Sequence, residues 1–104
     1  MVALLNAAIL TAYGSYDYKP ITVEEARALV SNGFVSYIGH ESTAQVLSEI
    51  LGVEVPVNRA VYVQQVGDRA IVFKLRDRLP AGQILERQQI EEIGYELGLL
   101  VRLR

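Results

Sequence analysis

The stretch FVSYIGHESTAQVLSEILG, residues 34–52, decides the fold because it joins a strand pattern to a helix pattern with a very short turn between them. Residues 34–38 are largely apolar and β-prone, which predicts a short strand. Apolar residues then recur at helical spacing up to Gly52, which is typical of a helix end. A strand followed directly by a helix indicates the α/β class, with the turn at Gly39 and His40.

The chain before this unit predicts a strand and a helix. Residues 2–10 form an apolar run interrupted by Asn6, which predicts a central strand buried on both faces with Asn6 inside it. Residues 13–20 predict a polar and aromatic connection that has room for a short edge strand. Thr22 followed by Glu25 is the sequence form of a capping box and predicts the start of an amphipathic helix.

The chain after the unit predicts a β-hairpin. Residues 60–66 and 69–75 flank Gly67 and Asp68, a two-residue turn that suits a tight hairpin. Beyond the hairpin the pattern predicts, in order, a loop, a short third helix and a last strand, at residues 78–82, 90–94 and 95–103. Together these patterns predict a single α/β domain over residues 1–104, with a mixed sheet of about five strands and about three helices packed on it.

Composition excludes several classes of function. The formal net charge is −2, with acidic and basic residues mixed along the chain, so we expect no binding of long nucleic acid. Without cysteine, the chain has no disulfide, thiol nucleophile or thiolate metal site, and cysteine-free chains fit the cytoplasm. The apolar N-terminus lacks the basic start of a signal peptide and the length of a membrane span, so no membrane partner is expected and the mature chain is expected to be the whole chain.

His40 is the candidate for proton chemistry, since histidine changes its charge near neutral pH and the chain has one histidine. It follows Gly39 and precedes Ser42 and Thr43 at the predicted helix start, where free backbone N–H groups favour a phosphate. The helix dipole disfavours the imidazolium form there, which suits a general base. The alternative is that His40 merely caps the helix.

Three further side chains are candidates for contacts with a ligand. Arg59 and Arg78 each lie where a predicted strand meets a loop, and a guanidinium group matches a phosphate in shape and charge. The alternative for both is a solvated arginine, and Arg78 also belongs to a charged cluster with Arg76 and Asp77. A buried Asn6 needs hydrogen-bond partners, so we expect it to hold a loop or to contact a base or ribose.

Familiar nucleotide motifs are missing from the sequence. It has neither a P-loop nor a glycine-rich dinucleotide fingerprint, and paired catalytic carboxylates are not evident. Tyr13, Tyr16 and Tyr18 are candidates for stacking on nucleobases, although interleaved tyrosines more often pack on their own sheet.

The order of five short segments resembles the viral ring nuclease family, small proteins of archaeal viruses, phages and some bacteria that act as type III anti-CRISPRs. The resemblance covers nearly the whole chain, and IGHESTA is its most specific part. The segments are LNAAIL at 5–10, IGHESTA at 38–44, NR at 58–59, RLPAG at 78–82 and IGYEL at 93–97.

The resemblance implies a homodimer that encloses cyclic tetra-adenylate, the second messenger of type III CRISPR defence, and cleaves it to linear di-adenylate without a metal or other cofactor. His40 would be the catalytic histidine, and Arg78 would match the arginine of the family's Arg-Leu-x-Glu-Gly loop. A viral member would act in the host cytoplasm. The expected ligand-binding positions are Asn6, Ala7, Gly39, Ser42, Thr43, Asn58, Arg59 and Gly82.

The chain departs from the family pattern at Ala81, where the loop has a catalytic glutamate. Three interpretations stay open: His40 performs the proton transfer unaided and slowly, Glu41 or Glu86 substitutes, or the protein mainly sequesters its ligand. A small protein-interaction module without a nucleotide ligand is a further alternative, with the apolar last strand and the tyrosine-rich segment as surfaces.

Overall fold

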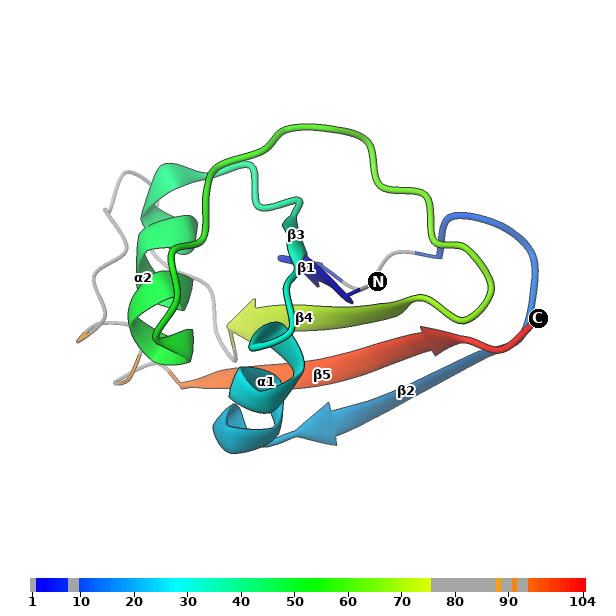
Figure 1. Cartoon of the computed structure of the whole chain (residues 1–104), viewed down its shortest axis with the longest axis horizontal. Coiled ribbons are helices and arrows are strands. Elements are labelled where there is room, and N and C mark those ends of the chain that lie inside the picture. The colour runs from blue at the N-terminus through cyan, green and yellow to red at the C-terminus, as the bar shows by residue number, and fades with distance from the viewer. Residues whose placement is uncertain (1, 8–9, 76–87, 89–90, 92–93) are drawn as a thin grey trace.

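Five strands form one mixed sheet in the computed structural model, which describes residues 2–7, 10–75, 88, 91 and 94–104 (Figure 1). The strand order is β2-β5-β4-β1-β3, so β2 and β3 are the edges. Two helices, α1 and α2, lie among the described residues. The elements are β1 (Val2–Leu5), β2 (Tyr16–Ile21), α1 (Val23–Val30), β3 (Val35–Ser36), α2 (Glu41–Leu51), β4 (Arg69–Leu75) and β5 (Tyr95–Arg102).

The three strands β4, β1 and β3 are parallel and bring their carboxyl ends to one edge of the sheet. Leu4 of β1 pairs with Ser36 of β3, and Leu5 pairs with Val72 of β4. All four residues of β1 are buried, which confirms the predicted strand buried on both faces. Strands β2 and β5 complete the sheet in antiparallel pairs. In parallel sheets the crevice beyond the carboxyl ends is the usual place for a ligand.

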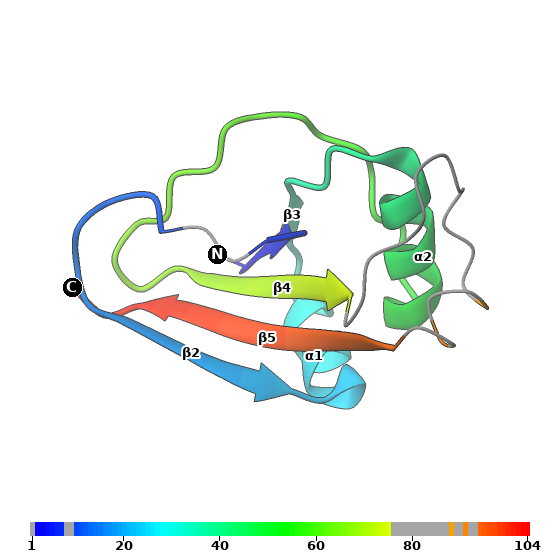
Figure 2. The same cartoon turned by 180° about the vertical axis from the view of Figure 1, so that it is seen from behind.

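Both helices pack on the same face of the sheet and build the larger core (Figures 1 and 2). Leu47 and Ile50 of α2 are each 1% exposed and lie in one cluster with Leu4 and Ile71 of the sheet. The helix ends as predicted at Gly52, whose φ of 70° is the left-handed backbone that glycine adopts readily. The predicted strand-turn-helix unit of residues 34–52 is therefore confirmed.

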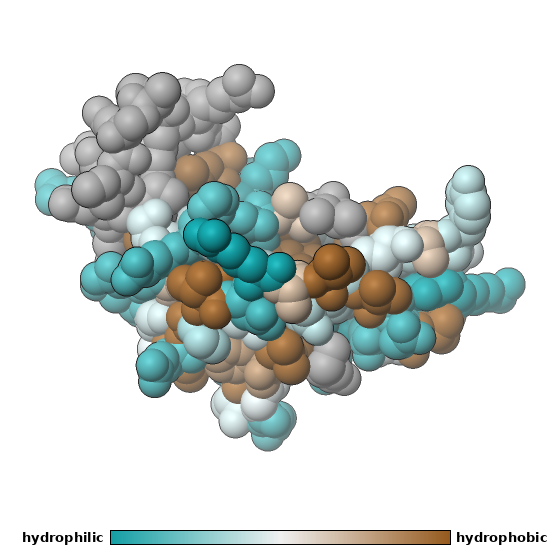
Figure 3. Space-filling model, turned by 90° about the horizontal axis from the view of Figure 1, so that it is seen from above, coloured by the Kyte–Doolittle hydropathy of each residue, from teal (hydrophilic) through white to brown (hydrophobic). Residues whose placement is uncertain are grey.

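The opposite face of the sheet carries a smaller cluster of buried residues, with Tyr16, Tyr37 and Tyr62 packed against it. Residues 53–66 run from the end of α2 to the start of β4 along one side of the sheet (Figure 1). Seen from that side, apolar side chains lie among polar ones on the surface (Figure 3). Gln64, which is fully buried, fastens this segment by donating from Nε2 to the carbonyl oxygen of Leu100 at 3.0 Å.

The predicted hairpin is wrong, although its turn forms. The amide of Asp68 donates to the carbonyl oxygen of Gln65 at 3.0 Å, yet residues 60–66 are not a strand. Strand β4 already pairs with β1 on one side and β5 on the other, so no edge is left for a hairpin partner. Val61 and Val63 consequently point to solvent, with 87% and 54% of their surface exposed.

Other boundaries differ from the sequence prediction as well. The first strand ends at Leu5, so Asn6 is exposed after the strand and not buried within it. The predicted strand at 34–38 shortens to β3, and the predicted edge strand and last strand are confirmed as β2 and β5. The third helix falls mostly outside the described residues; Gln88 and Glu91 are helical.

The capping box at Thr22 is present and gives a first testable prediction. The amide of Glu25 donates to Oγ1 of Thr22 at 3.1 Å, and the amide of Thr22 donates to Oε1 of Glu25 at 3.2 Å. Thr22→Ala should therefore lower the free energy of unfolding by about 1 kcal/mol, measured by urea titration. Ser15→Ala, which removes an exposed hydroxyl outside any helix, is the control and should change it by less than about 0.5 kcal/mol.

Candidate functional site

The candidate site lies where the parallel strands end. Asn6 and Ala7 follow β1, the β3–α2 loop of residues 37–40 follows β3, and the chain after β4 continues into residues 76–87, which are outside the described part. The sheet register places the ends of β1 and β3 side by side. Residues distant in sequence are therefore neighbours at this edge.

The β3–α2 loop is held tightly before it reaches His40. The amide of Tyr37 donates to the carbonyl oxygen of Leu4 at 2.9 Å, which prolongs the pairing of β3 with β1. Oγ of Ser36 accepts a hydrogen bond from the amide of Ile38 at 3.2 Å, and the Ile38 side chain is fully buried. The backbone immediately before His40 is therefore held in place by these hydrogen bonds.

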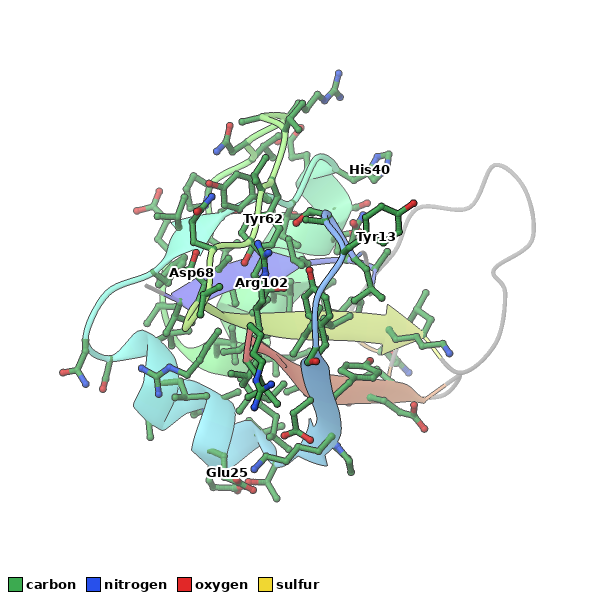
Figure 4. All side chains as sticks on the ribbon, turned by 90° about the vertical axis from the view of Figure 1, so that its right-hand side faces the viewer. Tyr13, Glu25, His40, Tyr62, Asp68 and Arg102 are labelled. Carbon is green, nitrogen blue, oxygen red and sulfur yellow. The ribbon has the colours of Figure 1, made fainter. Side chains whose placement is uncertain are left out.

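His40 occupies the N-cap position of α2, but capping does not account for its side chain. Its backbone is extended, with φ −122° and ψ 129°, and its imidazole makes no capping hydrogen bond to the helix. Figure 4 shows the ring pointing outward beside the start of α2. The amides of Glu41, Ser42 and Thr43 also have no hydrogen-bond acceptor among the described residues, so they remain able to bind an anion.

Residues 58–59 hold the β3–α2 loop in place through hydrogen bonds to its backbone. Asn58 donates from its amide to the carbonyl oxygen of Ile38 at 2.9 Å and from Nδ2 to that of Ser36 at 2.8 Å. Its Oδ1 accepts from the amide of Ala60 at 3.2 Å. Both polar atoms of the Asn58 side chain are thus bonded to backbone, which makes Asn58 a positioning residue for the loop in this structure.

Arg59 lies against the loop immediately before His40. Its Nε donates to the carbonyl oxygen of Gly39 at 3.0 Å, and its side chain is exposed. The two terminal nitrogens of the guanidinium group form no hydrogen bond with the part of the chain that the structure describes. The arginine is consequently anchored by one nitrogen, and its two terminal nitrogens have four N–H donors left for a ligand.

The structure gathers most of the predicted site residues into two neighbouring groups. Arg78 and Gly82 lie outside the described residues, as do Ala81 and Glu86. The first group surrounds the start of α2 and comprises Gly39, His40, Ser42, Thr43, Asn58 and Arg59. The second group, Asn6 and Ala7, lines a cavity.

That cavity has a volume of about 290 Å³ and two tyrosines in its wall. The ring centroids of Tyr37 and Tyr62 are 4.8 Å apart and the rings are inclined at 57°. Neither tyrosine is among the residues that the sequence marks as candidates for stacking, which are the tyrosines of residues 13–18. The signal was the alternation across residues 60–66, which turns Tyr62 and Gln64 inward. The lining residues are Leu5, Asn6, Ala7, Thr11, Tyr37, Ala60, Val61 and Tyr62.

The three tyrosines of residues 13–18 behave differently from one another. Tyr16 packs on the sheet, as interleaved tyrosines usually do, and its hydroxyl donates to the carbonyl oxygen of Ala12 at 2.8 Å. Tyr13 is fully exposed, and Tyr18 is half exposed on the edge strand β2.

The hydroxyl of Tyr62 is buried and has no hydrogen-bond partner in the described structure. Burial, followed by the nearby Asp68 carboxylate, raises the pKa of Tyr62 to about 12. The phenol therefore keeps its proton across the physiological range and remains a hydrogen-bond donor.

The described residues hold neither a metal-binding cluster nor a helix that could span a membrane. Across residues 2–7, 10–75, 88, 91 and 94–104, no three histidine, aspartate or glutamate side chains gather in a way that could hold a metal ion. Within the same ranges, neither helix has the length and apolar character needed to cross a bilayer.

Comparison with known proteins identifies relatives in viruses and in a bacterium. Uncharacterized protein 26 of Sulfolobus islandicus filamentous virus (isolate Iceland/Hveragerdi) is 36% identical over 105 residues, which cover 95% of this chain and 89% of that protein. Uncharacterized protein YddF of Bacillus subtilis (strain 168) is 33% identical over 105 residues, with 98% and 97% covered.

A solved structure shows the same fold. B116 of Sulfolobus turreted icosahedral virus superposes with a TM-score of 0.77 at 19% identity, over 97% of this chain and 98% of that one. The sequence also matches the STIV B116-like family over residues 2–97. The chain therefore belongs to the STIV B116-like family, the family of viral ring nucleases that its motifs resemble.

Proposed function

We propose that this protein is a metal-independent ring nuclease that binds cyclic tetra-adenylate across a homodimer and cleaves it to linear di-adenylate. It would thereby damp type III CRISPR signalling in the cytoplasm of the cell that makes the messenger. The observation that carries the proposal is the start of α2, where the imidazole of His40 makes no capping hydrogen bond and the first helix amides have no acceptor among the described residues. Arg59 is anchored beside them on the carbonyl oxygen of Gly39.

These groups suit a phosphodiester. The amides of Glu41, Ser42 and Thr43 and the positive end of the helix dipole attract the phosphate oxygens. The terminal nitrogens of Arg59 offer charge-assisted hydrogen bonds to the same group. Together they favour the extra negative charge that develops on the phosphate in the transition state.

Cleavage within an RNA strand can proceed with a general base and without a metal, because the nucleophile is the ribose 2′-hydroxyl of the substrate itself. The ribose 2′-hydroxyl attacks the adjacent phosphorus once the two are held in line, and the P–O5′ bond breaks. His40 takes the proton from the 2′-hydroxyl, and the departing 5′-oxygen takes a proton from solvent water; the imidazolium then returns its proton to solvent. The products then carry a 2′,3′-cyclic phosphate and a 5′-hydroxyl.

A two-fold dimer fits a ring with rotational symmetry. An isologous interface repeats each group on both subunits, so two copies of His40 would face opposite linkages of one ring. Two cuts in a four-nucleotide ring give two identical dinucleotides. The proposed product therefore follows from one histidine per chain.

The test is chromatography of cyclic tetra-adenylate after incubation with the protein in the presence of a chelator. Linear di-adenylate with cyclic phosphate ends is the expected product, and rings of other sizes are compared in parallel. An intact ring recovered from an excess of protein that binds it would replace the nuclease with a non-catalytic sponge. Ala81, at the place of the family glutamate, is the observation that favours this second function.

Arg59 gives a second prediction. Arg59→Ala should weaken binding of cyclic tetra-adenylate by about 10- to 100-fold, because charge-assisted hydrogen bonds contribute about 1.5–3 kcal/mol. Isothermal titration at two salt concentrations measures it, and the loss should be smaller at high salt. Arg69→Ala is the matched control, because Arg69 is an exposed arginine at the start of β4, the end of that strand that lies away from the candidate site. Equal losses in the two variants would remove Arg59 from the site.

A further inference from the structure

We propose that Pro20 closes the outer edge of β2 to a second copy of this chain, so that two copies cannot join their sheets edge to edge. The inference concerns the outer strands of the sheet, β2 and β3, and does not depend on the proposed function. An outer strand carries backbone groups that can pair with a strand of another chain, which makes it a place for unwanted association.

The outer edge of β3 is engaged within the chain. The amide of Tyr37 donates to the carbonyl oxygen of Leu4 at 2.9 Å, so the carbonyl groups of Ser36 and Ile38, on either side of Tyr37, point away from β1. Asn58 binds both of them, with its amide on Ile38 at 2.9 Å and its Nδ2 on Ser36 at 2.8 Å. A second chain that approached β3 would have to displace Asn58.

The outer edge of β2 carries backbone groups that face away from the sheet. Figures 1 and 2 show β2 along the outside of the sheet, beside β5. The amide of Leu103 donates to the carbonyl oxygen of Ser15 at 2.8 Å, and the antiparallel register continues from there through β2. Alternate residues of such a strand bond to the partner strand, so the backbone groups of residues 16, 18 and 20 point away from β5.

This edge is complementary to a second copy of itself. If two β2 strands ran antiparallel about a two-fold axis at Tyr18, Asp17 of each strand would face Lys19 of the other, and opposite charges across two strands attract. The ring of Tyr18 does not shield the edge, because it lies over β5, where a Cβ atom on Gly98 would meet it. A second copy of the chain is therefore the partner that the edge fits.

Pro20 interrupts that pairing. In the same register Tyr16 of each strand would face Pro20 of the other, as a pair that normally exchanges two hydrogen bonds. Proline has no N–H group, so each of these pairs loses the bond that residue 20 would donate. The central pair at Tyr18 is then the one pair left complete, and so short a ladder is not stable in water.

Pro20→Thr tests the proposal, because threonine restores the N–H group and favours a strand without adding a large apolar surface. Light scattering after size-exclusion chromatography should give a mass at least twice that of the unmodified protein at the same concentration. Pro56→Thr, at an exposed proline outside any helix or strand, is the matched control and should leave the mass unchanged. A Pro20→Thr protein with the circular dichroism and the mass of the unmodified protein would overturn the proposal.

Hydrogen exchange followed by NMR shows which surface is used. In the unmodified protein the amide of Tyr18 should exchange fast and that of Lys19, paired with Leu99 of β5, slowly. In Pro20→Thr the exchange at Tyr18 should slow as the protein concentration rises, whereas unfolding would speed the exchange at Lys19. Slow exchange at Tyr18 in the unmodified protein, or fast exchange in an associated Pro20→Thr protein, would each contradict the proposed edge.

The charge pair provides an independent check of the register. Adding Asp17→Lys to Pro20→Thr places like charges opposite each other and should return the mass to that of the unmodified protein. A mass that stays doubled would overturn the pairing about Tyr18. None of these readings uses cyclic tetra-adenylate, so a ring recovered intact contradicts the nuclease and leaves the inference about Pro20 standing.

Discussion

His40→Ala is expected to slow opening of cyclic tetra-adenylate by about 10²- to 10⁴-fold, the range attributed to a positioned general base. The affinity for the ring should stay within about twofold, because the amides at the start of α2 and Arg59 remain in place. The fold should also be unaffected, since the imidazole is exposed and makes no capping hydrogen bond. Single-turnover rates and direct titration measure the two quantities separately.

The control for His40 is Gln45→Ala, an exposed position one turn further along α2. It should leave both rate and affinity unchanged. Glu41→Gln examines whether the neighbouring carboxylate replaces the family glutamate, in which case the rate falls with His40 intact. A His40→Ala variant as fast as the unmodified protein would remove histidine from the chemistry.

Leu47→Ala is expected to lower the free energy of unfolding by about 2–5 kcal/mol, the usual cost of truncating a buried leucine. Leu47 is 1% exposed and joins α2 to the sheet within the larger core. The loss is a large part of the roughly 5–15 kcal/mol that stabilises a typical domain. Urea titration measures it, with Val61→Ala, 87% exposed, as the control that should change by less than about 0.5 kcal/mol.

A small effect in Leu47→Ala would mean that α2 is not seated by its apolar face. The start of the helix would then lack the rigid support that the proposed phosphate site requires. The stability measurement therefore bears on function as well as on the fold.

Local patterns in the sequence predicted local structure well. The capping box of Thr22 and Glu25 and the terminating Gly52 each act within a few residues, and α1 begins and α2 ends accordingly. The strand-turn-helix unit around His40 is equally local. The arrangement of these parts matched the family resemblance, which the comparisons confirm.

Local sequence patterns do not predict which distant segments pair with one another. The turn at Gly67 forms, but its local chemistry carries no information about β1 and β5, which occupy both edges of β4. The contact between Tyr37 and Tyr62 depends on the path of residues 53–66 along the sheet, so no residue next to either tyrosine in the sequence predicts it. Asn6 was expected inside a strand because an apolar run does not show where pairing stops.

The segment between α2 and β4 is tied down at two points, by Asn58 on the loop before His40 and by Gln64 on β5. The residues between these two ties form a wall of the cavity and belong to no helix or strand. Substitutions among residues 60–62 can therefore reshape the cavity while the loop that carries His40 keeps its hydrogen bonds to Asn58.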